Sequence, residues 1–177
     1  MKLFKSLLLA SAILLTSLIL AHCFLVSYSR ADEQFFVDGG LGIFNTAGDT
    51  LPQVKFMKMG MQEDLWGPLK QRFVGGAWAD SSGGGRMSGG FTGYQFAFEV
   101  TNSVLQASIA SGPVLISTPD TSLGGVFQLN ESIFLGVADK SHDSIGIVYN
   151  HFSSAGIEMP NLGKDYLGLE VKFPISF

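Results

Sequence analysis

Three polar side chains near the C terminus have the types and the spacing needed for ester hydrolysis. His151 and Ser153 are two residues apart, and Asp165 follows the connector 154–164. A serine becomes a nucleophile when a base takes its proton, and that base usually needs a third group to orient it. We therefore interpret Ser153 as a nucleophile, His151 as a general acid/base and Asp165 as the acid that orients the imidazole.

The two segments that carry these residues alternate with a period of two. Every second residue is apolar in 145–149 and in 167–177. Successive side chains of a strand point to opposite faces, so each segment predicts a strand with one apolar face. His151, Ser153 and Asp165 share the parity of the apolar residues, and the Cα atoms of a residue pair i, i+2 lie about 6.6 Å apart. The pattern places all three on the apolar face of neighbouring strands.

The N-terminal residues have the pattern of a secretory signal. Lys2 and Lys5 precede an apolar run, and a small-x-small site ends at Ala31, so we interpret 1–31 as a signal peptide and 32–177 as one domain. An uncleaved anchor helix is the alternative. Cleavage removes Cys23 and leaves eight basic and fifteen acidic residues, a net charge of −7. This charge argues against nucleic acid as a partner.

Short alternating segments on an exported chain with 15 Phe and 22 Gly favour a membrane β-barrel. Eight segments have strand character: 34–45, 51–61, 67–79, 91–101, 104–117, 124–137, 143–153 and 165–177. Bilayer-crossing strands need about 9–11 residues, and eight is the smallest even count for outer-membrane barrels. We predict an all-β, eight-stranded antiparallel transmembrane barrel of the bacterial outer membrane; a soluble lipocalin-like carrier is the alternative. Phe177 at the end of an aromatic alternation is similar to a signal read by the barrel assembly machinery.

Several single features receive simpler interpretations. Ser81–Gly90 is predicted as a loop, and Trp66, Trp78 and Tyr94 as aromatics of the barrel wall. Glu131 interrupts the apolar phase of its segment, and we interpret it as a local bulge; a membrane-facing functional acid is the alternative. No spacing of His, Cys, Asp and Glu indicates a metal site, and no glycine-rich run indicates a phosphate loop or other cofactor site.

The strand count sets the orientation and the depth of the polar residues. With Phe177 at the periplasmic end, an even number of strands puts both termini on that side. The turns near Glu63, Asn102 and Lys140 are predicted on that side, and the connectors near Ala47, Gly84, Asp120 and Ile157 outside. Twelve strand steps separate Asp165 from Phe177, about 40 Å of strand. At a tilt near 45° this is about 28 Å of membrane. The candidate residues are therefore predicted to face the outer leaflet, level with the lipid headgroups.

The same stretch resembles a known family. The run His151–Ile157, followed by 160–163 and an acid at Asp165, is similar to the lipid A 3-O-deacylase (PagL-type) family of outer-membrane esterases. The resemblance implies an eight-stranded barrel that hydrolyses the ester-linked acyl chain at the 3-position of lipid A in lipopolysaccharide. It also implies a Ser–His–Glu triad on the outside of the barrel, with no cofactor.

The sequence departs from the family at two positions. Asp165 stands where the family typically has Glu. Ser154 stands where it usually has Asn, thought to help form the oxyanion hole; a serine hydroxyl can still donate one hydrogen bond. Backbone N–H groups around Ala155 and Gly156 are candidate oxyanion donors, and Asn161 is either a loop-former or shapes the site. The second function kept open is a non-catalytic barrel for adhesion or envelope stability, and the oligomeric state, monomer or homodimer, stays open.

Overall fold

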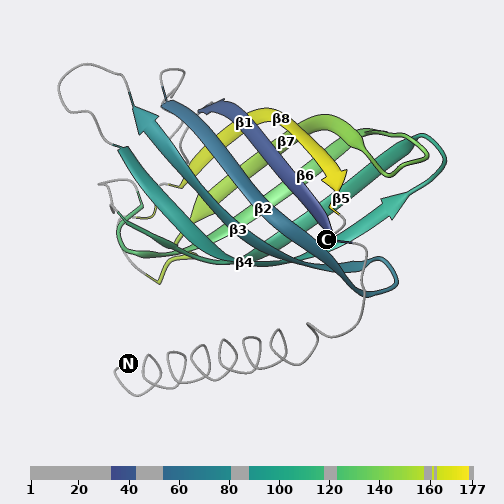
Figure 1. Cartoon of the computed structure of the whole chain (residues 1–177). Helices are drawn as coiled ribbons and strands as arrows, with labels where there is room; N and C mark the ends of the chain where they lie inside the picture. Colours follow the sequence, from purple (N-terminus) through teal and green to yellow (C-terminus); the bar gives the residue numbers. More distant parts are fainter. Residues whose placement is uncertain are drawn as a thin grey trace. The chain divides into compact units, whose positions relative to one another are not determined.

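The chain folds into a closed barrel of eight antiparallel strands (Figure 1). The computed structural model describes residues 33–42, 54–80, 88–117, 123–157, 161 and 163–175, all within the unit Asp32–Phe177. The strands are β1 (Gln34–Gly42), β2 (Val54–Trp66), β3 (Leu69–Asp80), β4 (Ser88–Thr101), β5 (Leu105–Ile116), β6 (Phe127–Ala138), β7 (Ser144–Ser153) and β8 (Lys164–Pro174). Each strand pairs with the next, and β1 pairs with β8 to close the sheet. The predicted fold class is confirmed, whereas the predicted signal peptide and Phe177 lie outside the described residues.

Among the described residues, no helix is long and apolar enough to cross a membrane.

Three short turns lie together at one end of the barrel (Figure 1). Gly67 supplies a positive φ between β2 and β3. The side chain of Asn102 accepts hydrogen bonds from two backbone N–H groups between β4 and β5, and Asp139 does the same between β6 and β7. The first turn was predicted near Glu63 and lies four residues later, because β2 continues in register with β3 through Gln62, whose side chain faces the interior. The predicted connectors near Ala47, Gly84 and Asp120 lie outside the described residues.

The beginning of β4 contradicts part of the predicted loop Ser81–Gly90. Residues 88–90 pair with β3, and Gly89 lies opposite Trp78. A Cβ atom on Gly89 would come within 2.4 Å of the Trp78 indole, so the glycine makes room for that ring. Trp78 is only 4% exposed and faces the interior, so its prediction as a wall aromatic is wrong. Glycine here serves packing inside a strand and not loop flexibility.

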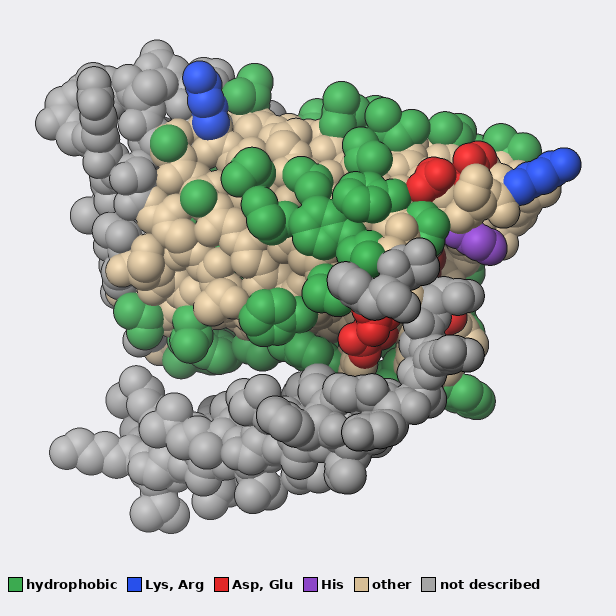
Figure 2. Space-filling view, in the orientation of Figure 1, with side chains coloured by type: hydrophobic (Ala, Val, Ile, Leu, Met, Phe, Trp, Pro, Cys, Tyr) green, Lys and Arg blue, Asp and Glu red, His purple; other side chains and the backbone are tan. Residues whose placement is uncertain are grey.

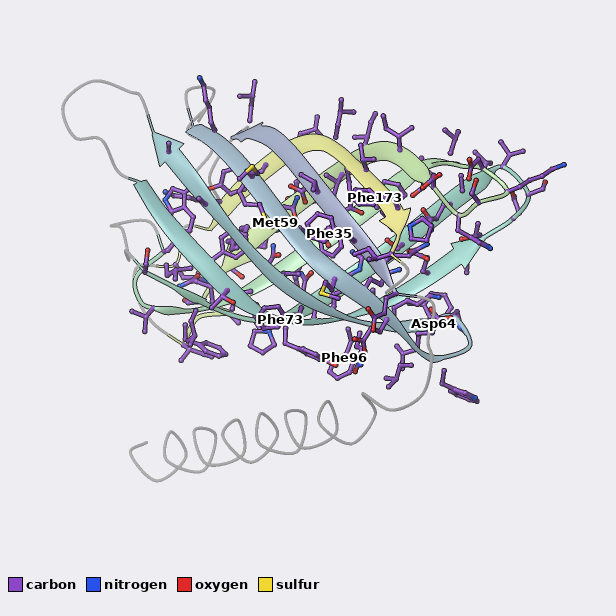
Figure 3. The ribbon with its side chains drawn as sticks, viewed as in Figure 1. Phe35, Met59, Asp64, Phe73, Phe96 and Phe173 are labelled. Atoms are coloured by element: carbon purple, nitrogen blue, oxygen red, sulfur yellow. The ribbon has the colours of Figure 1, made fainter. Side chains whose placement is uncertain are left out.

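Apolar side chains cover the outside of the barrel, as strands that face lipid require. Figure 2 shows hydrophobic groups over the middle of the visible wall, with charged groups nearer its ends. Figure 3 shows Phe73 and Phe96 projecting from the wall, and their side chains are 62% and 38% exposed. Other large exposed apolar residues are spread over the strands: Ile109, Leu135, Ile147, Leu167 and Leu169.

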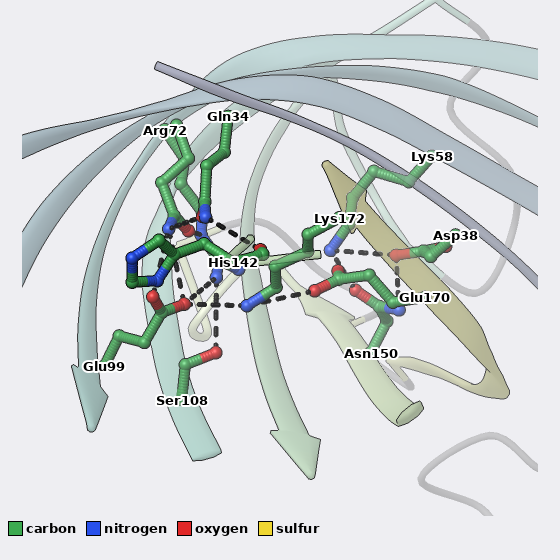
Figure 4. A network of polar contacts seen from close by, with 11 residues as sticks. Gln34, Asp38, Lys58, Arg72, Glu99, Ser108, His142, Asn150, Glu170 and Lys172 are labelled. Atoms are coloured by element: carbon green, nitrogen blue, oxygen red, sulfur yellow. Dashed lines mark hydrogen bonds and ion pairs between the residues drawn. The ribbon is translucent and has the colours of Figure 1, made fainter. Parts of the chain in front are cut away.

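The interior next to the turns holds a network of buried charges (Figure 4). Lys172 Nζ donates to Glu99 Oε2 at 2.7 Å, and Arg72 lies 3.6 Å from the same oxygen. Lys58 forms a second pair with Asp38 at 3.3 Å. Arg72, Lys58 and Lys172 have at most 1% of their side chains exposed, so each charge depends on its partners rather than on water.

The opposite half of the interior is aromatic. Phe56 stacks on Tyr166 with ring centroids 4.5 Å apart, and Phe91 meets Phe152 edge-on at 5.1 Å. Trp78 continues this cluster at 6.2 Å from Phe91. The rings have room at this end because some inward positions are occupied by small residues such as Gly89, whose Cβ would collide with Trp78. The described interior is therefore charged next to the turns and aromatic at the other end.

We expect the replacement Glu99→Gln to destabilise the barrel strongly. Gln keeps the shape but removes the charge that compensates Lys172 and Arg72, and breaking a buried ion pair costs about 3–5 kcal/mol. The free energy of unfolding is measured by urea titration in detergent micelles with tryptophan fluorescence. The control is Asp64→Asn, which removes the exposed ion pair with Lys70 and should cost less than about 1 kcal/mol. Equal losses in both variants would contradict a structural role for the buried network.

Candidate functional site

The pairing of β7 with β8 brings His151 and Asp165 together. They are direct cross-strand partners, and His151 Nδ1 lies 2.8 Å from Asp165 Oδ1. The side chain of His151 is 23% exposed, whereas that of Asp165 is 4% exposed. This geometry directs the Nδ1–H of a neutral ring to the carboxylate and leaves Nε2 as the basic nitrogen.

Both residues belong to the outward face of their strands. In β7, Asn150 and Phe152 are buried inside, whereas His151 and Ser153, which alternate with them along the strand, are partly exposed. Ile147, with the same parity, is 57% exposed on the wall. Odd-numbered side chains of β7 therefore point out of the barrel. His151 and Ser153 are the ones at the end of the strand opposite the three turns.

Ser153 is the last residue of β7 and lies opposite Leu129 of β6. It shares the outward face with His151, two residues earlier. Among the described residues, no hydrogen bond joins its hydroxyl to the His151 ring. The hydroxyl position depends on one side-chain torsion, so a rotation of χ1 is enough to change its distance from the ring.

The chain turns sharply after Ser153. Ile157 N donates to Ser154 O at 2.9 Å across Ala155 and Gly156, whose φ angles are 51° and 75°. Positive φ at both central positions is typical of type I′ turns. Among the described residues, no hydrogen bond occupies the N–H groups of Ala155 and Gly156, and both residues are exposed. These two N–H groups are therefore the available backbone donors beside Ser153.

Ser154 and Asn161 have different surroundings from those two donors. Ser154 is fully buried, and its N–H donates to Asn161 Oδ1 at 2.7 Å. That N–H is consequently occupied, and the Asn161 side chain ties the connector back to the end of β7. The contact gives Asn161 a defined role in shaping the loop.

Two residues near His151 were not predicted as part of the site. Tyr149 OH donates a hydrogen bond to Asp165 Oδ1, the oxygen that also contacts His151. Glu131 is exposed and lies directly opposite His151 on β6, in uninterrupted register from Leu129 to Ala138. The interpretation of Glu131 as a bulge is therefore wrong. Shared parity was a signal for both residues, but only the strand register shows which outward residues are neighbours.

No cluster of His, Cys, Asp and Glu suited to a metal ion occurs among the described residues.

These features define a class: a small outer-membrane β-barrel with a serine, a histidine and a carboxylate on its outer wall. The family model described as lipid A 3-O-deacylase (PagL) matches residues 54–174. The chain belongs to this family.

Two known proteins are similar to the chain. A segment of 53 residues is 42% identical to the lipid A deacylase PagL of Bordetella bronchiseptica. This match spans 30% of the present chain and 30% of the relative's length. The crystal structure of the outer membrane enzyme PagL superposes with a TM-score of 0.54 at 20% identity, covering 79% of this chain and 99% of that one. The structural match supports the barrel fold.

The turn after Ser153 yields a stability prediction. We expect Gly156→Ala to lower the free energy of unfolding by roughly 1–2 kcal/mol, because a Cβ atom disfavours left-handed φ. Among the described atoms this Cβ would contact nothing, so the cost would come from the backbone alone. The matched change Ala155→Gly should alter stability by less than about 1 kcal/mol, since relief of strain is offset by unfolded-state entropy. Urea titration of both variants is the measurement, and an unchanged Gly156→Ala protein would contradict the turn geometry.

Proposed function

We propose that the protein is an outer-membrane esterase that hydrolyses the 3-O-linked acyl chain of lipid A. The observation that carries the proposal is the 2.8 Å contact between His151 Nδ1 and Asp165 Oδ1, two residues from Ser153 on the same face. A carboxylate on Nδ1 fixes the tautomer that makes Nε2 a base. Membership of the family supplies the substrate class.

The proposed reaction has two half-reactions. Ser153 Oγ attacks the acyl carbonyl while His151 Nε2 takes its proton, and the imidazolium then protonates the departing sugar oxygen. Water next attacks the acyl-serine ester with the same histidine as base, and a free fatty acid leaves. The carboxylate of Asp165 stabilises the imidazolium. Substrate binding is the step at which the Ser153–His151 hydrogen bond must form.

The tetrahedral intermediate of each half-reaction carries a negative oxygen. The N–H groups of Ala155 and Gly156 lie two and three residues after Ser153 and are free of the turn bond, so we assign them as its donors. Ser154 is buried at the position where the family usually has Asn, so its hydroxyl is a weaker candidate than these two N–H groups. The contribution of Asn161 is to hold this loop through the Ser154 N–H.

The setting proposed for the site is the outer leaflet. His151, Ser153 and Asp165 lie at the end of the barrel opposite the turns, which is the external end if the termini are periplasmic. Exposed Ile147 and Leu167 flank them on the wall and suit contact with acyl chains. The proposed partners are therefore lipopolysaccharide, the bilayer and, through Phe177, the barrel assembly machinery.

Expression in a bacterium with hexa-acylated lipid A tests the activity directly. We expect the mass of extracted lipid A to fall by one 3-hydroxyacyl chain, and Ser153→Ala to abolish this loss because it removes the nucleophile. Ser144→Ala is the matched control, since Ser144 faces the interior of the same strand. Unchanged lipid A with folded wild-type barrel would favour the non-catalytic function in adhesion or envelope stability.

The histidine and the acid have separable effects in the same assay. We expect His151→Asn to abolish activity and Asp165→Asn to lower the rate about 10³–10⁴-fold, because the amide favours the wrong tautomer. His142→Asn is the control for a histidine replacement, as His142 lies in the exposed β6–β7 turn. Initial rates of fatty-acid release from lipid A in detergent micelles provide the measurement. Full activity in Asp165→Asn would contradict the orienting role.

A further inference from the structure

The carboxylate of Asp165 is buried although it belongs to the outward face of β8. Its residue is 3% exposed, whereas Leu167 and Leu169, with the same parity, are 48% and 59% exposed. Two side chains of β7 contact its carboxylate: His151 through Nδ1 and Tyr149 through its hydroxyl. Both reach the same oxygen, Oδ1. Both contacts to the acid therefore come from the same neighbouring strand.

The strand register explains how the phenol reaches the acid. Tyr149 lies opposite Leu167, and His151 lies opposite Asp165, so Tyr149 and Asp165 are diagonal neighbours. Diagonal pairs lie about 7–8 Å apart at their Cα atoms, a span that an aromatic side chain can bridge. Tyr149 and His151 are on one face of one strand, and their separation is fixed by the backbone.

A charged carboxylate on the outer wall of a membrane barrel needs donors because lipid supplies none. Hydrogen bonds to a charged group are roughly twice as strong as neutral ones. A phenol that donates to Oδ1 restrains the torsion of the short Asp side chain and keeps that oxygen directed at the imidazole. Without this donor, His151 would be the remaining contact of Oδ1 among the described residues.

We infer that Tyr149 is a positioning residue of the esterase. It joins Ser153, His151 and Asp165 in a row on the outer wall, and it fixes Asp165 so that Asp165 can orient His151. This inference rests on the proposed function. Tyr149 acts through the acid and is not assigned contact with the reacting atoms, so its removal should lower kcat and leave KM nearly unchanged.

The barrel offers a matched control for removing one phenolic hydroxyl. Tyr94 on β4 also belongs to the outward face, and its hydroxyl donates to Gln71 Oε1 at 2.6 Å. β4 is separated from β7 by β5 and β6 in the barrel order. Tyr94→Phe thus repeats the chemical change of Tyr149→Phe on the same kind of surface, with a neutral acceptor far from His151.

The test measures deacylation of lipid A in detergent micelles by purified full-length barrels, with each rate normalised to the folded fraction seen as a gel mobility shift. We expect Tyr149→Phe to lower kcat about 10-fold, the value of one charge-assisted hydrogen bond, with KM within about twofold of wild type. Tyr94→Phe should match wild type. An inactive wild type would overturn the proposed function itself, which separates that failure from a failure of this inference.

A double-mutant cycle establishes whether Tyr149 acts through Asp165. If it does, Tyr149→Phe should cause no further loss, within about twofold, in an Asp165→Asn background. Three results would overturn the inference in an active enzyme: wild-type kcat in Tyr149→Phe, the same loss in both backgrounds, or a rise in KM alone. The last two would instead indicate an independent contact with substrate.

Discussion

The register between β7 and β8 is the constraint on which the site depends. It places His151 opposite Asp165 and leaves Tyr149 one diagonal step away. Strand side chains alternate, so a slip of one residue would move each of them to the other face and into the interior. The register is secured by the inward residues of the same strands, because Asn150 and Phe152 fit only the polar and aromatic surroundings inside the barrel. The outer arrangement is thus a consequence of inner packing.

An eight-stranded barrel is narrow, and large side chains fit inside it because glycines lie next to them. A Cβ on Gly60 would come within 2.8 Å of the Phe36 ring, and one on Gly136 within 2.5 Å of the Phe134 ring. Phe134 in turn lies 4.1 Å below the Lys172 ammonium, which bonds to Glu99. Glycine, ring and charge therefore form one connected set. This packing brings each buried ammonium of the set against a ring and a carboxylate.

Periodicity, taken together with the export signal and the aromatic C terminus, was sufficient to predict the fold, the strand count and the outward face of His151, Ser153 and Asp165. It failed where an inward residue determined the outcome. β4 begins at Ser88 because Gly89 makes room for Trp78, and β2 passes Gln62 because that side chain joins the inner network. Tyr149 and Glu131 were missed for a related reason. Parity gives the face of a residue, whereas its neighbours across the sheet depend on register, which no single strand encodes.

The exterior position of Tyr149, His151, Ser153 and Asp165 affects which concentration governs the binding of a lipid there. In the setting proposed above, a lipid ligand of His151 and Ser153 dissolves in the film of lipid or detergent around the barrel and meets the protein by diffusion in two dimensions. The fraction of barrels with a bound lipid therefore depends on the mole fraction of that lipid within the film. Diluting the film with inert amphiphile weakens the apparent binding of such a lipid even when its total concentration is held constant.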